Sequence, residues 1–143
     1  MNNFDFSPVL KYGIYNVAGR LLLTAAPFVL MFVGAGLYEF ALSLVRGIVI
    51  GVLDSIIMLE GARRALPYAN NPYKGLLIMG RFRVYRIVSA CSLFALMLRM
   101  NYPAFGASLG FLLIHILFLF NLLFIAYRLN RITREERSEK DGK

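Results

Sequence analysis

Four long apolar stretches separated by short polar segments dominate this sequence of 143 residues. A helix needs roughly 20 residues to cross a hydrocarbon core of about 30 Å, and each stretch has that length or nearly so. Because lipid offers the backbone no hydrogen bonds, a spanning segment of this kind folds as a helix. We therefore expect an all-α integral membrane protein with four transmembrane helices, which cover approximately residues 15–38, 40–61, 84–98 and 105–127.

The segments between the apolar stretches predict two helical hairpins. Residues 34–39 leave room for only a very short connection in the first pair, and the turn at residues 99–103 of the second pair contains asparagine and proline. A longer polar link at residues 62–83 joins the two hairpins. We expect residues 1–127 to form a membrane domain of four helices and residues 128–143 to form a charged cytoplasmic tail that begins as a helical extension.

The composition and the positions of the charges favour a membrane protein over a soluble one. Hydrophobic residues make up 59% of the chain and charged residues 17%, whereas globular chains have roughly 45–50% and ~25%. The net charge is +8, but fourteen of the sixteen basic residues would lie on one side of a four-span protein. The positive-inside rule makes that side the cytoplasm. We therefore expect both termini in the cytoplasm and no nucleic-acid partner.

Asp54 lies near the middle of the second apolar stretch, where a charge costs a few kcal/mol by insertion scales. Acidic residues at such positions usually face a partner or a wet cavity, so Asp54 is a candidate ligand for a cation, a proton path or a basic residue. The alternative is an internal contact with Arg46 or with Ser and Asn side chains of neighbouring helices. A protonated carboxyl group, which desolvation favours, is a further option.

Two pairs of glycine residues have the spacing that lets membrane helices pack closely. Gly47 and Gly51 lie four residues apart in the second stretch, and Gly106 and Gly110 have the same spacing in the fourth. On a helix, Gly47, Gly51 and Asp54 share one face. Such faces allow two backbones to approach each other, within this chain or with a partner subunit. We interpret the four glycines as helix-docking residues.

Two further polar side chains, His115 and Asn121, lie in the fourth stretch. His115 is nine positions from Gly106, so we expect it to point away from the face that carries Gly106, Gly110 and Asn121 and to have a hydrogen-bonded packing role. One histidine cannot form a bis-histidine haem site, although an axial ligand shared with another subunit is conceivable. We expect no cofactor and no metal site, unless Asp54 serves a transported cation.

Basic side chains are concentrated around the end of the second stretch and the polar link, on the expected cytoplasmic side. This basic cluster comprises Arg63, Arg64, Arg81 and Arg83. Glu60 stands three and four residues before the first two arginines, a spacing that predicts ion pairs on one helix face.

The sequence contains no arrangement of residues that points to catalysis. It has no glycine-rich phosphate loop after a strand, no paired histidines and no serine elbow with a histidine partner. Asp54 and Glu60 are six positions apart and do not share a helix face. We therefore expect a protein that is not an enzyme.

The stretch from Arg46 to Ile116 resembles the subunit I proteins of bacterial F-type ATP synthases. The resemblance rests on the small-residue stretch and basic cluster GIVIGVLDSIIMLEGARR, on the basic lead-in RFRVYRIVSACSLFALMLR and on the opening FGASLGFLLIHI. Arg99, the short turn after it and the opening that contains Gly106 and Gly110 are the most characteristic features. Asp54 departs from the family pattern, which more often has small polar residues there with an asparagine nearby.

The resemblance implies a small accessory protein beside the ATP synthase in the bacterial cytoplasmic (inner) membrane. Subunit I proteins are thought to assist assembly or stability of the ring of c subunits, and a role in magnesium uptake has also been proposed. The implied partners are c subunits or other membrane subunits, membrane lipid and, as an option, a second copy of this chain. We expect the c subunits to dock on the small-residue helix faces that carry Gly47, Gly51, Gly106 and Gly110. A hard divalent cation needs several oxygen ligands, so transport through Asp54 would require oligomerisation or ligation by water and backbone. An anchoring role in another membrane complex is the third alternative.

Overall fold

The computed structural model describes residues 13–68, 70–100 and 102–141, and it describes side chains for these residues except 14, 15, 129, 130 and 132–141. Within this part of the chain, all regular elements are helical, which confirms the expected all-α fold class. They are α2 (Ile14–Gly34), α3 (Tyr38–Ala65), the short 3₁₀ helix η1 (Leu66–Tyr68), α4 (Pro72–Arg99) and α5 (Ala104–Asp141).

Three of the four long helices, α2, α3 and α5, are long and apolar enough to cross a membrane. The sequence predicted four such spans. α4 has 28 residues, the same length as α3, but Lys74, Arg81, Arg83 and Arg86 all lie in its first fifteen positions. These four cations lower the hydropathy of the helix that contains the expected third span.

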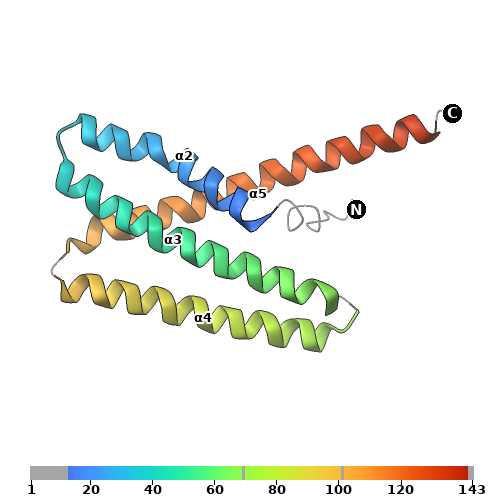
Figure 1. Cartoon of the computed structure of the whole chain (residues 1–143), viewed down its shortest axis with the longest axis horizontal. Helices are drawn as coiled ribbons and strands as arrows, with labels where there is room; N and C mark the ends of the chain where they lie inside the picture. The colour runs from blue at the N-terminus through green and yellow to red at the C-terminus, as the bar shows by residue number, and fades with distance from the viewer. Residues whose placement is uncertain (1–12, 69, 101, 142–143) are drawn as a thin grey trace.

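α3 is the central helix of the molecule, and α2, α4 and α5 each pack against it. Figure 1 shows α4 running antiparallel beside α3, whereas α5 passes behind α3 and extends beyond the other helices. The main apolar core is built from α2, α3 and α5, and its buried members include Val17, Leu21, Leu44, Ile48, Val52, Ile114, Phe118 and Ile125. By contrast, Met97 is the one buried residue among the described residues of α4.

The connection between α2 and α3 is the short turn that the sequence predicts. Gly36 has a φ of 76°, in the left-handed region that glycine adopts without strain. The N–H of Gly36 donates to the carbonyl of Val33, and the N–H of Leu37 donates to the carbonyl of Phe32, each at 3.0 Å. These are the two hydrogen bonds of a Schellman motif, which satisfies the last carbonyls of α2 and ends the helix.

The segment between α3 and α4 is mostly helical, which differs from the polar link expected at residues 62–83. α3 continues to Ala65, and α4 already begins at Pro72. The side chain of Asn71 accepts a hydrogen bond of 3.3 Å from the backbone N–H of Lys74, and proline suits the first helical position because no partner is needed there for its missing N–H. Polar residues therefore mark the surface of a helix here rather than a loop.

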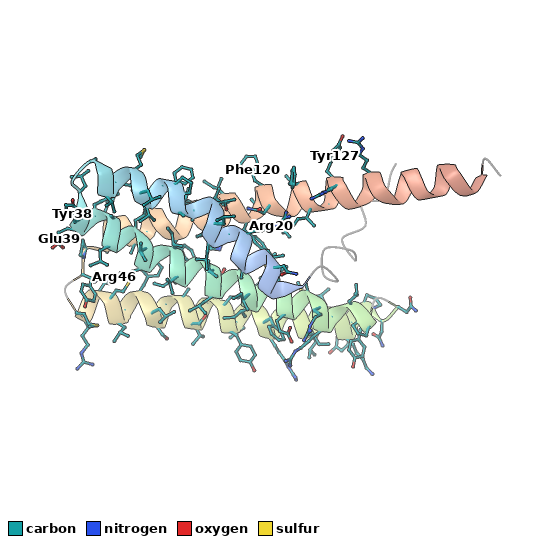
Figure 2. The ribbon with its side chains drawn as sticks, turned by 45° about the horizontal axis from the view of Figure 1, so that its top comes forward. Arg20, Tyr38, Glu39, Arg46, Phe120 and Tyr127 are labelled. Atoms are coloured by element: carbon teal, nitrogen blue, oxygen red, sulfur yellow. The ribbon has the colours of Figure 1, made fainter. Side chains whose placement is uncertain are left out.

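The outer surface of the helices is rich in large apolar side chains. Leu23 on α2, Leu76 on α4 and Phe120 on α5 are among the exposed examples. In Figure 2, Phe120 and Tyr127 point outward from α5. Extensive exposed apolar surface on a folded chain marks contact with lipid or with other proteins. Together with the three long apolar helices, this surface suggests a membrane protein.

Candidate functional site

The four glycines predicted to dock helices all lie in the interface between α3 and α5. A Cβ atom added at Gly47 would overlap the carbonyl oxygen of Ala107, and one added at Gly110 would overlap that of Leu44. The other two glycines, Gly51 and Gly106, lie closest to side chains instead of backbone. A Cβ atom at Gly51 would lie 2.9 Å from the side chain of Ile114.

A Cβ atom at Gly106 would similarly lie 2.8 Å from the Cβ atom of Ser43. The hydroxyl group of Ser43 donates a hydrogen bond to the carbonyl of Pro103, just before α5 begins. The glycine faces of both helices are therefore occupied within this chain, which is one of the two options that the sequence left open.

Asp54 lies where α3, α4 and α5 meet, and its carboxylate has two partners from the other two helices. Nε of Arg86 donates to Oδ1 at 3.0 Å, and Nη2 of Arg86 donates to Oδ2 at 2.6 Å. Nε2 of His115 lies 2.9 Å from Oδ2. The Asp54 side chain is only 5% exposed, against 28% for that of Arg86, so the ion pair extends from the interior to the edge of the helical bundle.

His115 connects this ion pair to the backbone of α5. Its Nδ1 lies 2.8 Å from the carbonyl oxygen of Phe111, while its Nε2 faces Asp54. Both neighbours are acceptors, so a neutral ring donates to only one of them and an imidazolium donates to both. We call Asp54, Arg86 and His115 the polar cluster. The cluster is an internal contact between three helices, which is one of the alternatives that the sequence left open for Asp54, although with other partners than Arg46, Ser or Asn.

The position of His115 corrects the expectation that it points away from the glycine face. A face repeating every four residues rotates by about 40° per step around a helix of 3.6 residues per turn. On α5 this face runs from Gly106 through Gly110 to Ile114. His115 directly follows Ile114 and reaches Asp54 of α3, so counting nine positions from Gly106 alone misplaces it. The ring of Phe111, one turn earlier, meets Phe94 of α4 edge to face at 5.6 Å, which shows that this side of α5 is directed toward α4.

Two other polar residues of interest stay outside the polar cluster. The Asn121 side chain donates to the carbonyl of Leu117 in its own helix at 2.9 Å. Arg46, the partner suggested for Asp54 by the sequence, instead stacks its guanidinium group over the ring of Tyr102, 3.6 Å from the centroid. Figure 2 shows Arg46 near Tyr38 and Glu39, at the end of the molecule where α2 and α3 meet.

The sequence alone did not identify Arg86 as the partner of Asp54. Arg86 was counted only among the fourteen basic residues expected on the cytoplasmic side. A signal was available in the symmetry of the hairpin. In an antiparallel pair of helices, residues equally distant from the turn lie side by side. The turn between α3 and α4 is centred near Asn70, and Asp54 and Arg86 each lie 16 residues from it.

Three of the four arginines in the basic cluster line an open cavity of about 600 Å³ between the end of α3 and the first half of α4. Its lining residues are Arg63, Arg64, Pro67, Tyr68, Ile78, Arg81, Phe82 and Tyr85. Arg83, the fourth predicted member of the basic cluster, is exposed and does not line the cavity. The expected ion pairs of Glu60 are confirmed, at 2.9 Å from Nε of Arg63 and 2.7 Å from Nε of Arg64.

The contacts of Asp54 limit what this carboxylate can do chemically. Both of its oxygens face donors, so a metal cation would have to displace Arg86 before it could bind. Among the described residues, no three His, Cys, Asp or Glu side chains are grouped so that they could hold a metal ion.

No family model, curated protein or solved structure matches this chain.

Proposed function

We propose that this chain is a non-enzymatic accessory membrane protein of a bacterial F-type ATP synthase that assists assembly or stability of the c-subunit ring. The observation that carries the proposal is that the three segments resembling subunit I proteins lie next to one another in the fold. Residues 47–64 and 105–116 are far apart in the sequence, yet they pack against each other through their glycines. Residues 81–99, the third such segment, lie in α4 beside α3 and supply Arg86 to the polar cluster. The resemblance thus covers one contiguous unit of three helices.

The same proposal includes four crossings of the bacterial inner membrane, with both termini in the cytoplasm. The path of the chain supports them. α4 starts beside the C-terminal end of α3, and α5 starts beside its N-terminal end, where Gly106 meets Ser43. If α3 crosses the bilayer, α4 must cross it in the opposite direction. Arg86 does not prevent this, because its charge is paired with that of Asp54.

The outer face of α4 is the surface that we propose for a partner subunit. The glycine faces are already packed within the chain, so a c subunit cannot use them without separating α3 from α5. On α4, by contrast, Val84, Ile87 and Val88 lie at i, i+3 and i+4, and each is 57% exposed. This spacing places them on one apolar stripe against which another membrane helix can pack.

The test is made in the native membrane with the full-length chain carrying a tag. We expect c subunits to co-purify with it in mild detergent and deletion of the chain to lower the fraction of c subunits found in rings. Ile87→Ser should weaken co-purification, whereas Leu23→Ser on the exposed face of α2 is the matched control and should not. An unchanged ring yield after deletion, together with no co-purification, would refute the proposal.

The cation-transport alternative gains no support from the site. Asp54 would have to release Arg86 and His115 to bind a cation. A hard divalent cation takes several oxygen ligands, and the described residues contain no group of three His, Cys, Asp or Glu side chains that could hold a metal ion. The anchoring alternative, with His115 near a cofactor, is also unsupported because both ring nitrogens already face oxygen atoms of this chain.

A further inference from the structure

The cavity between α3 and α4 combines two kinds of wall. Three guanidinium groups, those of Arg63, Arg64 and Arg81, contribute the cationic wall, and Ile78 and Phe82 contribute apolar surface. We infer that this cavity binds an anionic phospholipid, with the phosphate group against the arginines and an acyl chain along the apolar wall. This inference goes beyond the proposed function, because it requires a membrane but no ATP synthase.

The charges around the cavity favour an anion. Glu60 bonds to Arg63 and Arg64, so one carboxylate opposes three guanidinium groups and two positive charges remain uncompensated. Arg64 uses only Nε for its pair with Glu60, which leaves its terminal N–H groups available. Arg81 is exposed and has no ion pair with any described residue. Guanidinium groups of this kind bind phosphate oxygens in a fork geometry.

The apolar wall is built by specific contacts of Phe82 with α3 and with its own helix. Phe82 packs against Gly61 so closely that a Cβ atom there would lie 2.7 Å from the Phe82 side chain. The Arg64 guanidinium lies over the same ring, 5.6 Å from its centroid, and Tyr85 meets it edge to face at 5.9 Å. Phe82 therefore contacts Gly61, Arg64 and Tyr85, and it lies where the cationic and apolar walls meet.

The position of the cavity along α3 selects a lipid over a soluble phosphate compound. α3 has 28 residues and is therefore about 42 Å long, whereas the hydrocarbon core is about 30 Å thick. Its C-terminal turns, with Arg63 and Arg64, then reach the headgroup region. Tyrosine side chains such as Tyr68 and Tyr85 are typical of that depth, where anionic headgroups attract arginine.

The test uses purified full-length protein in mild detergent and native mass spectrometry with added lipid. We expect phosphatidylglycerol to bind at least fivefold more tightly than phosphatidylcholine. Arg81→Gln should weaken phosphatidylglycerol binding about fivefold, the effect of one interfacial arginine. Arg83→Gln is the matched control, since it removes the same charge two residues away and outside the cavity, and it should change binding less than twofold.

Each alternative outcome has a definite consequence. Equal losses for Arg81→Gln and Arg83→Gln would overturn the inference, because the attraction would then be diffuse. Equal binding of the two lipids would also overturn it. If inorganic phosphate or glycerophosphoglycerol competes as well as the intact lipid at constant ionic strength, the ligand is a soluble phosphate and the assignment to lipid is wrong. Arg64→Gln serves as a second variant if the elution volume of Arg81→Gln departs from that of the parent protein.

Discussion

α3 packs against α5 and against α4 in two very different ways. Toward α5, the interface depends on backbone approach, since Gly47 and Gly110 leave no room for a single additional carbon atom. Toward α4, contact depends on individual side chains, chiefly the Asp54–Arg86 ion pair and the packing of Phe82 on Gly61. α3 buries residues along most of its length, whereas α4 buries only Met97 among its described residues.

The difference shows how a helical protein can combine a rigid part with a more weakly attached one. Close backbone packing has one geometry, because the surfaces fit only when the glycines face each other. An ion pair between flexible side chains tolerates small displacements of the helices. We therefore expect α2, α3 and α5 to form the stable core, and α4 to be the helix that exchanges partners or adjusts to lipid.

The largest expected effect comes from filling the glycine interface. In Gly47→Ala, the new methyl group would overlap the backbone carbonyl of Ala107, which cannot rotate away as a side chain can. The helices must then separate, and we expect a loss in the free energy of unfolding of more than about 3 kcal/mol, at the upper end for overpacking. Unfolding in detergent, followed by circular dichroism during titration with sodium dodecyl sulfate, measures this loss.

The matched control lies on α4, where a Cβ atom at Gly80 would meet no other atom within 4 Å. Gly80→Ala should leave the free energy of unfolding unchanged or raise it by up to about 1 kcal/mol, because alanine favours the helix over the unfolded chain. Similar losses for Gly47→Ala and Gly80→Ala would show that the two interfaces do not differ as described.

The second prediction concerns the polar cluster. Asp54→Asn removes the negative charge and leaves Arg86 largely inside the bundle without a counter-charge, so we expect a loss of about 2–4 kcal/mol in the free energy of unfolding. Arg86→Gln should have a similar effect. The double variant should cost clearly less than the sum of the two single losses, because the ion pair can be lost only once. The same titration in detergent measures all three variants.

His115→Leu tests how much His115 contributes to stability independently of Arg86. It leaves the two hydrogen bonds from Arg86 in place, so we expect a smaller loss of about 1 kcal/mol. For the preceding prediction, a double variant of Asp54→Asn and Arg86→Gln whose loss in free energy of unfolding equals the sum of the two single losses would contradict the ion pair.

Much of the fold followed from the sequence, because hydropathy and glycine spacing are local signals. The apolar stretches predict α2, α3 and α5, and Gly36 marks the turn after α2. The polar link at residues 62–83 was not recognised as mostly helical, since a charged stretch of helix resembles a loop when only hydropathy is considered. The capping residue Asn71, directly before Pro72, was the signal for where α4 begins.

The candidate site was harder to predict, because it depends on three helices meeting. Asp54 and the glycines could be selected individually from their unusual positions. The partner Arg86 follows from the register of the hairpin once its turn is located near Asn70, whereas the partner His115 depends on the way α5 passes α3, which no single stretch encodes. His115 shows this well, since its role follows from its distance to Asp54 and not from its spacing to Gly106.

The smallest effect is expected at Glu60, which completes the comparison within one helix. Like Asp54, Glu60 is an α3 carboxylate paired with arginine, but the side chains of its partners Arg63 and Arg64 are 60% and 63% exposed. Water already stabilises these charges, so Glu60→Gln should cost less than about 1 kcal/mol. Added salt should abolish this small loss through screening, whereas the loss in Asp54→Asn should persist because the pair is shielded from ions. A loss at Glu60 that equals the one at Asp54 would mean that burial does not set the strength of these pairs, and the attachment of α4 would need another explanation.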